Sequence, residues 1–204
     1  MKKLLLFFTI ITSLHFPSVA QFLNLRYGPE IGVGISTLNI AVTSGTSQQA
    51  TAVSGKTTKQ FGIVADKSFS EHFSIQPALL YVGKGASGTS INYLEVPVNL
   101  VYTKGEGHGV FVSIGPYIGY AIGGTGVNIG KASDTTSTNL GIKSIDYGVQ
   151  AGLGWQLRNG LIFKFNFDMG LSDLNFKTTD QKITTGTFMF TIGWLLWGQS
   201  MYDL

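Results

Sequence analysis

The sequence of 204 residues has no cysteine, few charged residues and, beyond its first twenty residues, no long apolar segment. Without cysteine it can form neither a disulfide framework nor a catalytic thiolate. No segment after residue 20 reaches the ~18 uninterrupted apolar residues of a transmembrane helix. If the chain enters a membrane, it must therefore do so as a closed β-barrel, since only helices and closed barrels satisfy every backbone group in lipid.

The balance of charge excludes one class of partner. Charged residues make up only 12% of the chain, about half the roughly 25% of an average globular domain. The formal charge of +3, from 14 basic and 11 acidic residues, falls to +1 (12 against 11) without Lys2 and Lys3. There is no basic stripe of the kind that binds nucleic acid, so we expect no nucleic-acid partner.

Residues 1–20 have the pattern of a secretory signal peptide. Two lysines supply the charged start, residues 4–14 the apolar centre, and Ser18 and Ala20 the small residues before a cleavage site. The alternative is an anchor helix, but the apolar run is shorter than the ~20 residues that span a bilayer. We expect cleavage after Ala20, export of the chain, and one mature domain at residues 21–204.

The clearest pattern in the chain is an alternation of apolar and polar residues through 146–171. A period of two is typical of a β-strand, and Asn159-Gly160 between two such runs favours a hairpin. Apolar outside and polar inside is the polarity of a membrane barrel, with lipid on one face and the lumen on the other. In the second run the two faces are Phe163, Phe165, Phe167 and Met169 against Lys164, Asn166 and Asp168.

Similar alternation elsewhere brings the number of predicted strands to eight, joined by connections that are alternately long and short. This rhythm predicts an all-β fold: an eight-stranded antiparallel up-and-down transmembrane β-barrel with short periplasmic turns and longer extracellular loops. Inside the third strand Pro77 removes a ladder hydrogen bond, so we expect a bulge or a locally lost bond there. The predicted strands are 26–40, 57–67, 73–83, 91–103, 110–123, the two of the 146–171 hairpin, and 185–197; the predicted outer loops are 41–56, 84–90, 124–141 and 172–184.

Three motifs resemble the PorT-like outer-membrane β-barrel family: KG at 84–85, YLEVPVNLVY at 93–102, and DYGVQAGLGWQL followed by FKFNFDMGLSDL within 146–174. The resemblance covers nearly all of the mature chain. It implies a barrel in the outer membrane of a Gram-negative bacterium, with no assigned activity in most members and a secretion apparatus linked to the namesake. The partners it implies are outer-membrane lipid and envelope or secretion-machinery proteins, and we expect a monomeric barrel.

Two sets of side chains follow from the predicted faces: a polar network in the barrel interior and aromatic girdles at the two membrane interfaces. An eight-stranded barrel is only wide enough to be filled by its own side chains, so a packed polar plug is favoured over a solute path. With Lys164 as the single inward base, acids outnumber bases, which leaves room for water or a cation. The network comprises Glu30, Asp66, Glu95, Lys164 and Asp168; the girdles comprise Tyr81, Tyr102, Tyr120, Tyr147, Trp155 and Trp194.

No catalytic, cofactor-binding or metal site is predicted. His72 and His108 fall in predicted turns without a spaced second ligand, so solvated turn residues are the simpler interpretation. The expected function is therefore non-catalytic: a structural or interaction role, or an accessory role in envelope machinery, carried by the outer loops. Two alternatives stay open. One is a narrow solute or ion channel using the interior carboxylates, and the other is a soluble, exported lipocalin-like ligand-binding barrel with apolar side chains inward.

Overall fold

The computed structural model describes residues 25–44, 47–52, 55–86, 88–105, 107–131, 140–175 and 181–198. The predicted signal peptide and its cleavage site lie outside these residues. Within the described part of the chain, no helix has the length and apolar character needed to cross a membrane.

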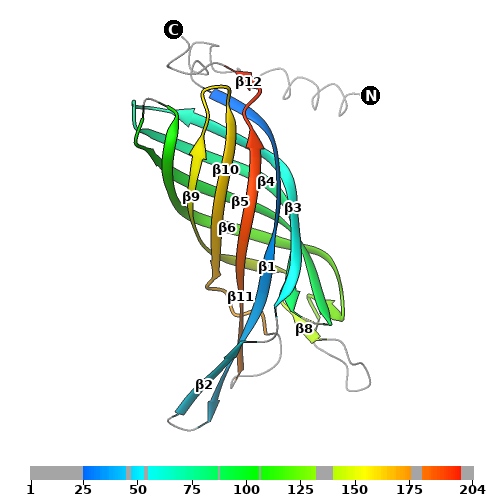
Figure 1. The fold of residues 1–204 in the computed structure, drawn as a ribbon. Helices are drawn as coiled ribbons and strands as arrows, with labels where there is room; N and C mark the ends of the chain where they lie inside the picture. Colours follow the sequence, from blue (N-terminus) through cyan, green and yellow to red (C-terminus); the bar gives the residue numbers. More distant parts are fainter. Residues whose placement is uncertain are drawn as a thin grey trace, which may run out of the picture.

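Eight long antiparallel strands close into a barrel, which confirms the predicted fold class (Figure 1). Each of these strands pairs with the next one along the chain. The last of them pairs with the first from Glu30↔Gly193 to Val42↔Gln181, which closes the sheet. The eight strands are β1 (Leu25–Ser44), β3 (Lys56–Ser68), β4 (Phe73–Ala86), β5 (Thr89–Thr103), β6 (Gly109–Thr125), β9 (Ile145–Gln156), β10 (Leu161–Gly170) and β11 (Gln181–Trp194).

Short strands extend the barrel at its two ends. Figure 1 places β2 and β8 at the bottom of the view, an end that we name the loop end, and β12 at the top. The top also carries the short turns 69–72, 104–108 and 157–160, and we name it the turn end. The short strands are β2 (Ser47–Ala52), β7 (Val127–Ile129), β8 (Leu140–Ile142) and β12 (Trp197–Gly198).

The strands run further toward the loop end than the sequence predicts. The prediction of a loop at 84–90 is wrong, because β4 and β5 stay paired as far as Ala86↔Thr89. The predicted loop 41–56 is also shorter, since β1 continues to Ser44 and β2 folds back onto it. Segments rich in glycine, serine and threonine show no alternation of apolar and polar side chains, although their backbones can still pair in a sheet. The alternation pattern therefore could not predict where these strands end.

Pro77 interrupts the sheet without shifting it. On one side of the proline strand, the β3–β4 pairs skip from Val64↔Ala78 to Lys67↔Ile75 with the register unchanged. Pairing is therefore lost locally at the proline, which was one of the two expected outcomes. The other, a β-bulge, does not form there. The register shift lies instead in the β5–β6 ladder, between Asn92 and Tyr93.

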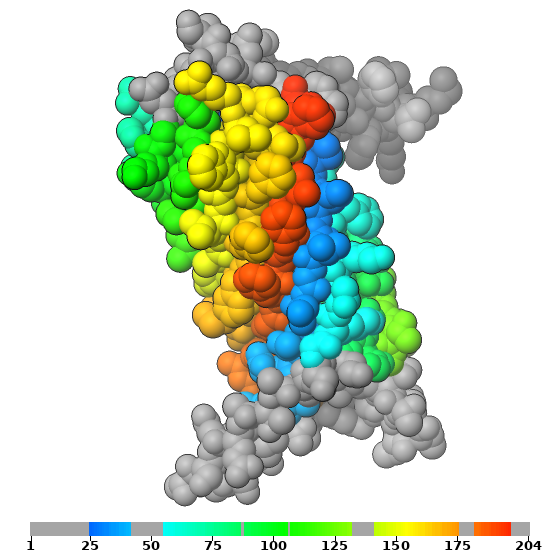
Figure 2. All heavy atoms as spheres, viewed as in Figure 1, coloured from blue at the N-terminus to red at the C-terminus, as the bar shows by residue number. Residues whose placement is uncertain are grey.

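The barrel wall has apolar side chains outside and polar side chains inside, as the alternation predicts. Ile31 and Phe165 are 61% and 49% exposed, and Figure 2 shows the outward side chains of β10, β11 and β1 lying side by side along the wall. Inside, Glu95 is fully buried opposite Leu80, and other apolar residues such as Phe111 are buried there as well. A lipocalin-like barrel has the reverse arrangement, so that alternative is wrong.

The turn between β9 and β10 forms as predicted. Leu157 N–H donates to the Leu161 carbonyl at 2.8 Å, and Gly160 N–H donates to the Leu157 carbonyl at 3.0 Å. Gly160 has φ = 83°, a left-handed conformation that glycine adopts at little cost. The turn also contacts β11, since Trp194 Nε1 donates to the Asn159 carbonyl at 2.9 Å.

Candidate functional site in the barrel interior

The predicted interior residues all point into the barrel, but they belong to separate groups rather than to one network. Each group joins a base to a carboxylate, or a carboxylate to an amide, across neighbouring or facing strands. The sequence also missed three members. Lys164 is not the single inward base, because Arg26 and Lys84 are buried too, and Asp146 is a further buried acid.

The group nearest the loop end is centred on Lys84, which lies on β4. Its Nζ is 2.5 Å from Glu95 Oε2 and 3.4 Å from Asp146 Oδ2, and it lies 4.0 Å from the centre of the Tyr117 ring. One ammonium thus holds two carboxylates from different strands, β5 and β9. Lys84 is 1% exposed, and both carboxylates are fully buried, so solvent screens these attractions only weakly.

Asp146 ties further elements to this group, which we name the Lys84 cluster (Lys84, Glu95, Tyr117 and Asp146). Its Oδ1 accepts a hydrogen bond from Ser172 Oγ at 2.5 Å, and its Oδ2 accepts one from Thr185 Oγ1 at 3.0 Å. Tyr117 Oη donates to the same Oδ2 at 3.4 Å. A carboxylate with three hydroxyl donors and a lysine is well satisfied, as a buried charge must be.

A second group lies between β1, β3 and β10. Lys164 Nζ is 2.7 Å from Glu30 Oε2, and Gln60 Nε2 donates to Glu30 Oε1 at 2.7 Å. Lys164 therefore pairs with Glu30 and not with Asp168, its neighbour on the same strand. Asp168 instead accepts a hydrogen bond from Gln150 Nε2 at 2.7 Å.

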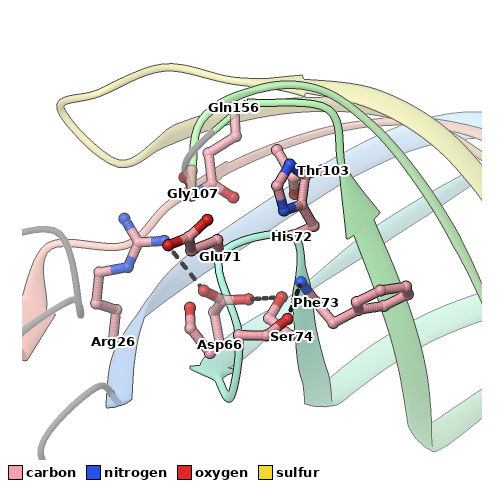
Figure 3. Close-up of a pocket in the computed structure, with 11 residues that line it drawn as sticks. Arg26, Asp66, Glu71, His72, Phe73, Ser74, Thr103, Gly107 and Gln156 are labelled. Carbon is pink, nitrogen blue, oxygen red and sulfur yellow. Dashed lines mark hydrogen bonds and ion pairs between the residues drawn. The ribbon is translucent and has the colours of Figure 1, made fainter.

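The third group closes the turn end, and Figure 3 draws its members Arg26, Asp66 and Ser74. Arg26 Nη2 lies 3.0 Å from Asp66 Oδ2. The other oxygen, Asp66 Oδ1, accepts hydrogen bonds from Ser74 Oγ at 2.6 Å and Gln76 Nε2 at 3.0 Å. Beside them, Gln156 Nε2 donates to the Gly107 carbonyl at 2.8 Å. The hollow between these residues measures about 10 Å³, close to the space one water molecule needs.

Two of the three missed residues, Lys84 and Asp146, have recognisable signals. Lys84 continues the inward series of Ala78, Leu80 and Val82 at a period of two, and was lost only because the predicted strand stopped at residue 83. Asp146 lies one residue before the first outward tyrosine of β9 and therefore belongs to the inward face. Continuing the inward–outward alternation of each strand beyond its predicted end would have identified both residues as inward-facing.

The histidines lie at the turn end and are half-buried. His72 stacks on Tyr102 with 6.0 Å between ring centres, and His108 Nε2 accepts a hydrogen bond from Arg158 Nε at 3.2 Å. They are not purely solvated residues, as the sequence suggested, because each packs against or bonds to a neighbour. In the described residues, no three His, Cys, Asp or Glu side chains are grouped so that they could hold a metal ion.

The residues of the predicted girdles point outward in two tiers. Toward the loop end, Tyr81 and Tyr120 both lie opposite Leu94, and Tyr147 lies opposite Ile118. Toward the turn end the tier consists of Tyr102, Trp155 and Trp194. All are exposed except Tyr81, which is half-buried and stacks on Phe61 at 4.9 Å. Their role at a membrane interface stays a prediction.

Comparison with protein families agrees with a barrel. A family model described as an outer membrane protein beta-barrel domain matches residues 19–175. Among solved structures, Ail, the attachment invasion locus protein of Yersinia pestis, is 12% identical with a TM-score of 0.38, over 82% of this chain and 97% of that chain. Neisserial surface protein A is 10% identical with a TM-score of 0.44, over 82% and 97%. OprG from Pseudomonas aeruginosa is 13% identical with a TM-score of 0.40, over 84% and 97%. A search of curated proteins finds no match.

Proposed function

Because the chain belongs to the family of outer membrane proteins with a β-barrel domain, we propose that it is a sealed, non-catalytic barrel that acts through its loop end. In this proposal residues 1–20 direct export in a Gram-negative bacterium and are removed. The loop end faces the outside, the turn end faces the periplasm, and the aromatic tiers mark the membrane interfaces. The partners are membrane lipid and envelope proteins, including the secretion machinery linked to PorT-like barrels.

The observation that carries the proposal is the pairing of charges across the lumen. The Lys84 cluster joins β4 and β5 to β9 near the loop end, and Lys164 with Glu30 joins β10 to β1, which are not neighbouring strands. A solute on its way through would have to separate these buried pairs. Removing one partner of such a pair costs about 3–5 kcal/mol, which is far above thermal energy. The pairs therefore favour a plug over the alternative of a channel.

Planar-bilayer recording tests the sealed barrel directly. We expect purified, folded protein to leave the bilayer silent, with insertion verified by protease protection of vesicles prepared in parallel. A stable single-channel conductance from the inserted wild-type barrel would refute the plug and favour a channel that uses the interior carboxylates. Recovery of the protein in an aqueous periplasmic extract would refute membrane placement altogether.

The absence of cysteine allows a clean test of orientation. Lys143→Cys places a thiol at the loop end, and Lys104→Cys places one at the turn end; both lysines are exposed. A membrane-impermeant maleimide added to intact cells should label only the Lys143→Cys variant, and both variants should react after the cells are broken. Labelling of the Lys104→Cys variant alone in intact cells would reverse the proposed orientation.

A further inference from the structure

The ladder between β3 and β4 opens near the loop end. Regular pairing stops at Gln60↔Val82, and the isolated bridge Gly55↔Ala86 lies beyond the gap. The bridge is out of register with the ladder by one residue, so the intervening segments cannot pair in a regular way. A groove of about 230 Å³ occupies the opening and is lined chiefly by residues 56–59 of β3 and 83–85 of β4.

The groove has basic and neutral polar walls. Lys56 and Lys59 line it with exposed side chains, and its further lining includes Tyr81 and Asn92 but no Asp or Glu. Gly83 contributes no side chain, and a Cβ at this position would have only ordinary contacts, the nearest at 3.6 Å to Thr58 Oγ1. The space over Gly83 is therefore open to a ligand in a groove that Lys56 and Lys59 also line.

A buried hydroxyl also faces this space. Thr58 lines the groove and is 4% exposed, yet its Oγ1 has no hydrogen-bond partner among the described residues. A buried polar group without a partner costs free energy, and a water, an ion or another bound molecule that hydrogen-bonds to it removes this cost. The hydroxyl can donate to an oxygen acceptor placed between the lysines.

The groove lies at the edge of the outward apolar wall. On β3, Phe61 and Ile63 continue the wall toward the turn end with exposed fractions of 56% and 58%, and Phe61 carries the stacked Tyr81 ring. Lys59 is the next outward residue on the loop side. Lysine at such a boundary lays its alkyl stem along apolar surface and holds its ammonium at the depth of lipid headgroups.

We propose that this groove, the Lys59 groove (Lys56, Thr58, Lys59 and Gly83), binds the phosphorylated headgroup of a lipid in the leaflet at the loop end. Two lysines supply the counter-charge, and the Thr58 hydroxyl donates to a phosphate oxygen. A membrane lipid is the occupant because lipid surrounds the wall at this depth and the groove has the size of a headgroup rather than of a protein segment. The inference rests on the proposed membrane placement and adds a ligand class to it.

Native mass spectrometry measures how much lipid the folded barrel retains after it is released from neutral detergent. The probes are phosphatidic acid and phosphatidylcholine with the same acyl chains. We expect wild type to retain phosphatidic acid preferentially. The variant Lys56→Gln/Lys59→Gln should lose about 25-fold in affinity, taking roughly a factor of five for each lysine near a lipid surface. Gly83→Leu, which fills the groove without changing charge, should abolish the preference.

The control is Lys131→Gln/Lys143→Gln, which removes two exposed loop-end lysines outside the groove. Unchanged retention by the groove variants, or an equal loss in the control, would overturn the inference, the latter in favour of a diffuse basic surface. Displacement of the lipid by equimolar inorganic phosphate would also overturn it, because the site would then bind the free anion. Heat-modifiable gel mobility confirms that each variant is folded. Failure of wild type to insert into vesicles would instead refute the proposed function, whatever the lipid result.

Discussion

Replacing Lys84 by methionine should destabilise the barrel more than any surface change. Methionine keeps the length and apolar stem of the side chain but removes the charge that holds Glu95 and Asp146. All three side chains are at most 1% exposed, so water cannot replace the lost ammonium without opening the wall. Breaking a buried pair by removing one partner costs about 3–5 kcal/mol. With two carboxylates released, we expect Lys84→Met to fall within the upper half of that range.

Equilibrium unfolding by urea in lipid vesicles, followed by tryptophan fluorescence, measures the change in the free energy of unfolding. Lys143→Met is the matched control, because it deletes an exposed loop-end charge and should change stability by no more than about 0.5 kcal/mol. The triple variant Lys84→Met/Glu95→Gln/Asp146→Asn should recover most of the loss, since no uncompensated charge remains buried.

Two results would refute this reasoning. If Lys84→Met unfolds within about 0.5 kcal/mol of wild type, the Lys84 cluster does not stabilise the barrel. If the triple variant is as unstable as the single one, the loss comes from side-chain packing around residue 84 and not from unpaired carboxylates. The second result would also remove the main support for an electrostatic plug, because the charges would then be incidental to closure.

Three further changes test other parts of the structure. Phe165→Arg puts a charge on the exposed outward wall of β10, where we expect a loss of about 2–4 kcal/mol and failed assembly in gel-mobility assays; normal assembly would contradict the outward assignment. Gly160→Ala forces a side chain into a left-handed turn with φ = 83° and should cost about 1–3 kcal/mol by urea unfolding, whereas a neutral result would show that the turn relaxes. Glu30→Gln leaves Lys164 without its counter-charge and should destabilise by about 3 kcal/mol, with recovery on adding Lys164→Met; no recovery would show that the two residues are not coupled.

The fold was predictable because alternation is a property of the chain itself. Residues such as Phe163, Phe165 and Phe167 must share one face of a strand, and Lys164 and Asp168 must share the other, whatever the rest of the molecule does. The face of each charged residue followed directly. Strand ends were less predictable, since backbone pairing extends through Gly, Ser and Thr segments that show no alternation.

The partners inside the barrel were not predictable. The alternation of side chains along β10 places Lys164 and Asp168 on the same inward face. It does not determine which other strand each side chain contacts. That depends on the stagger of the strands around the barrel, which sets Glu30 opposite Gly193 and Lys164 opposite Thr191. The pairing of Lys164 with Glu30 is thus a consequence of closure, and closure is a property of all eight strands together.

A formal charge near zero conceals an uneven distribution. Residues 21–204 contain 12 basic and 11 acidic side chains. Among those that the structure describes, the interior holds three bases and five acids, an excess of two negative charges. Outside the interior, the residues that the structure describes include eight bases and two acids, an excess of six positive charges. The interior excess is tolerated because hydroxyl and amide donors satisfy the carboxylates that have no base of their own. The exterior excess includes Lys56 and Lys59, which the proposed anionic headgroup would neutralise. The charged residues inside the barrel thus link its strands, and the basic residues outside it are those that the proposed lipid contact uses.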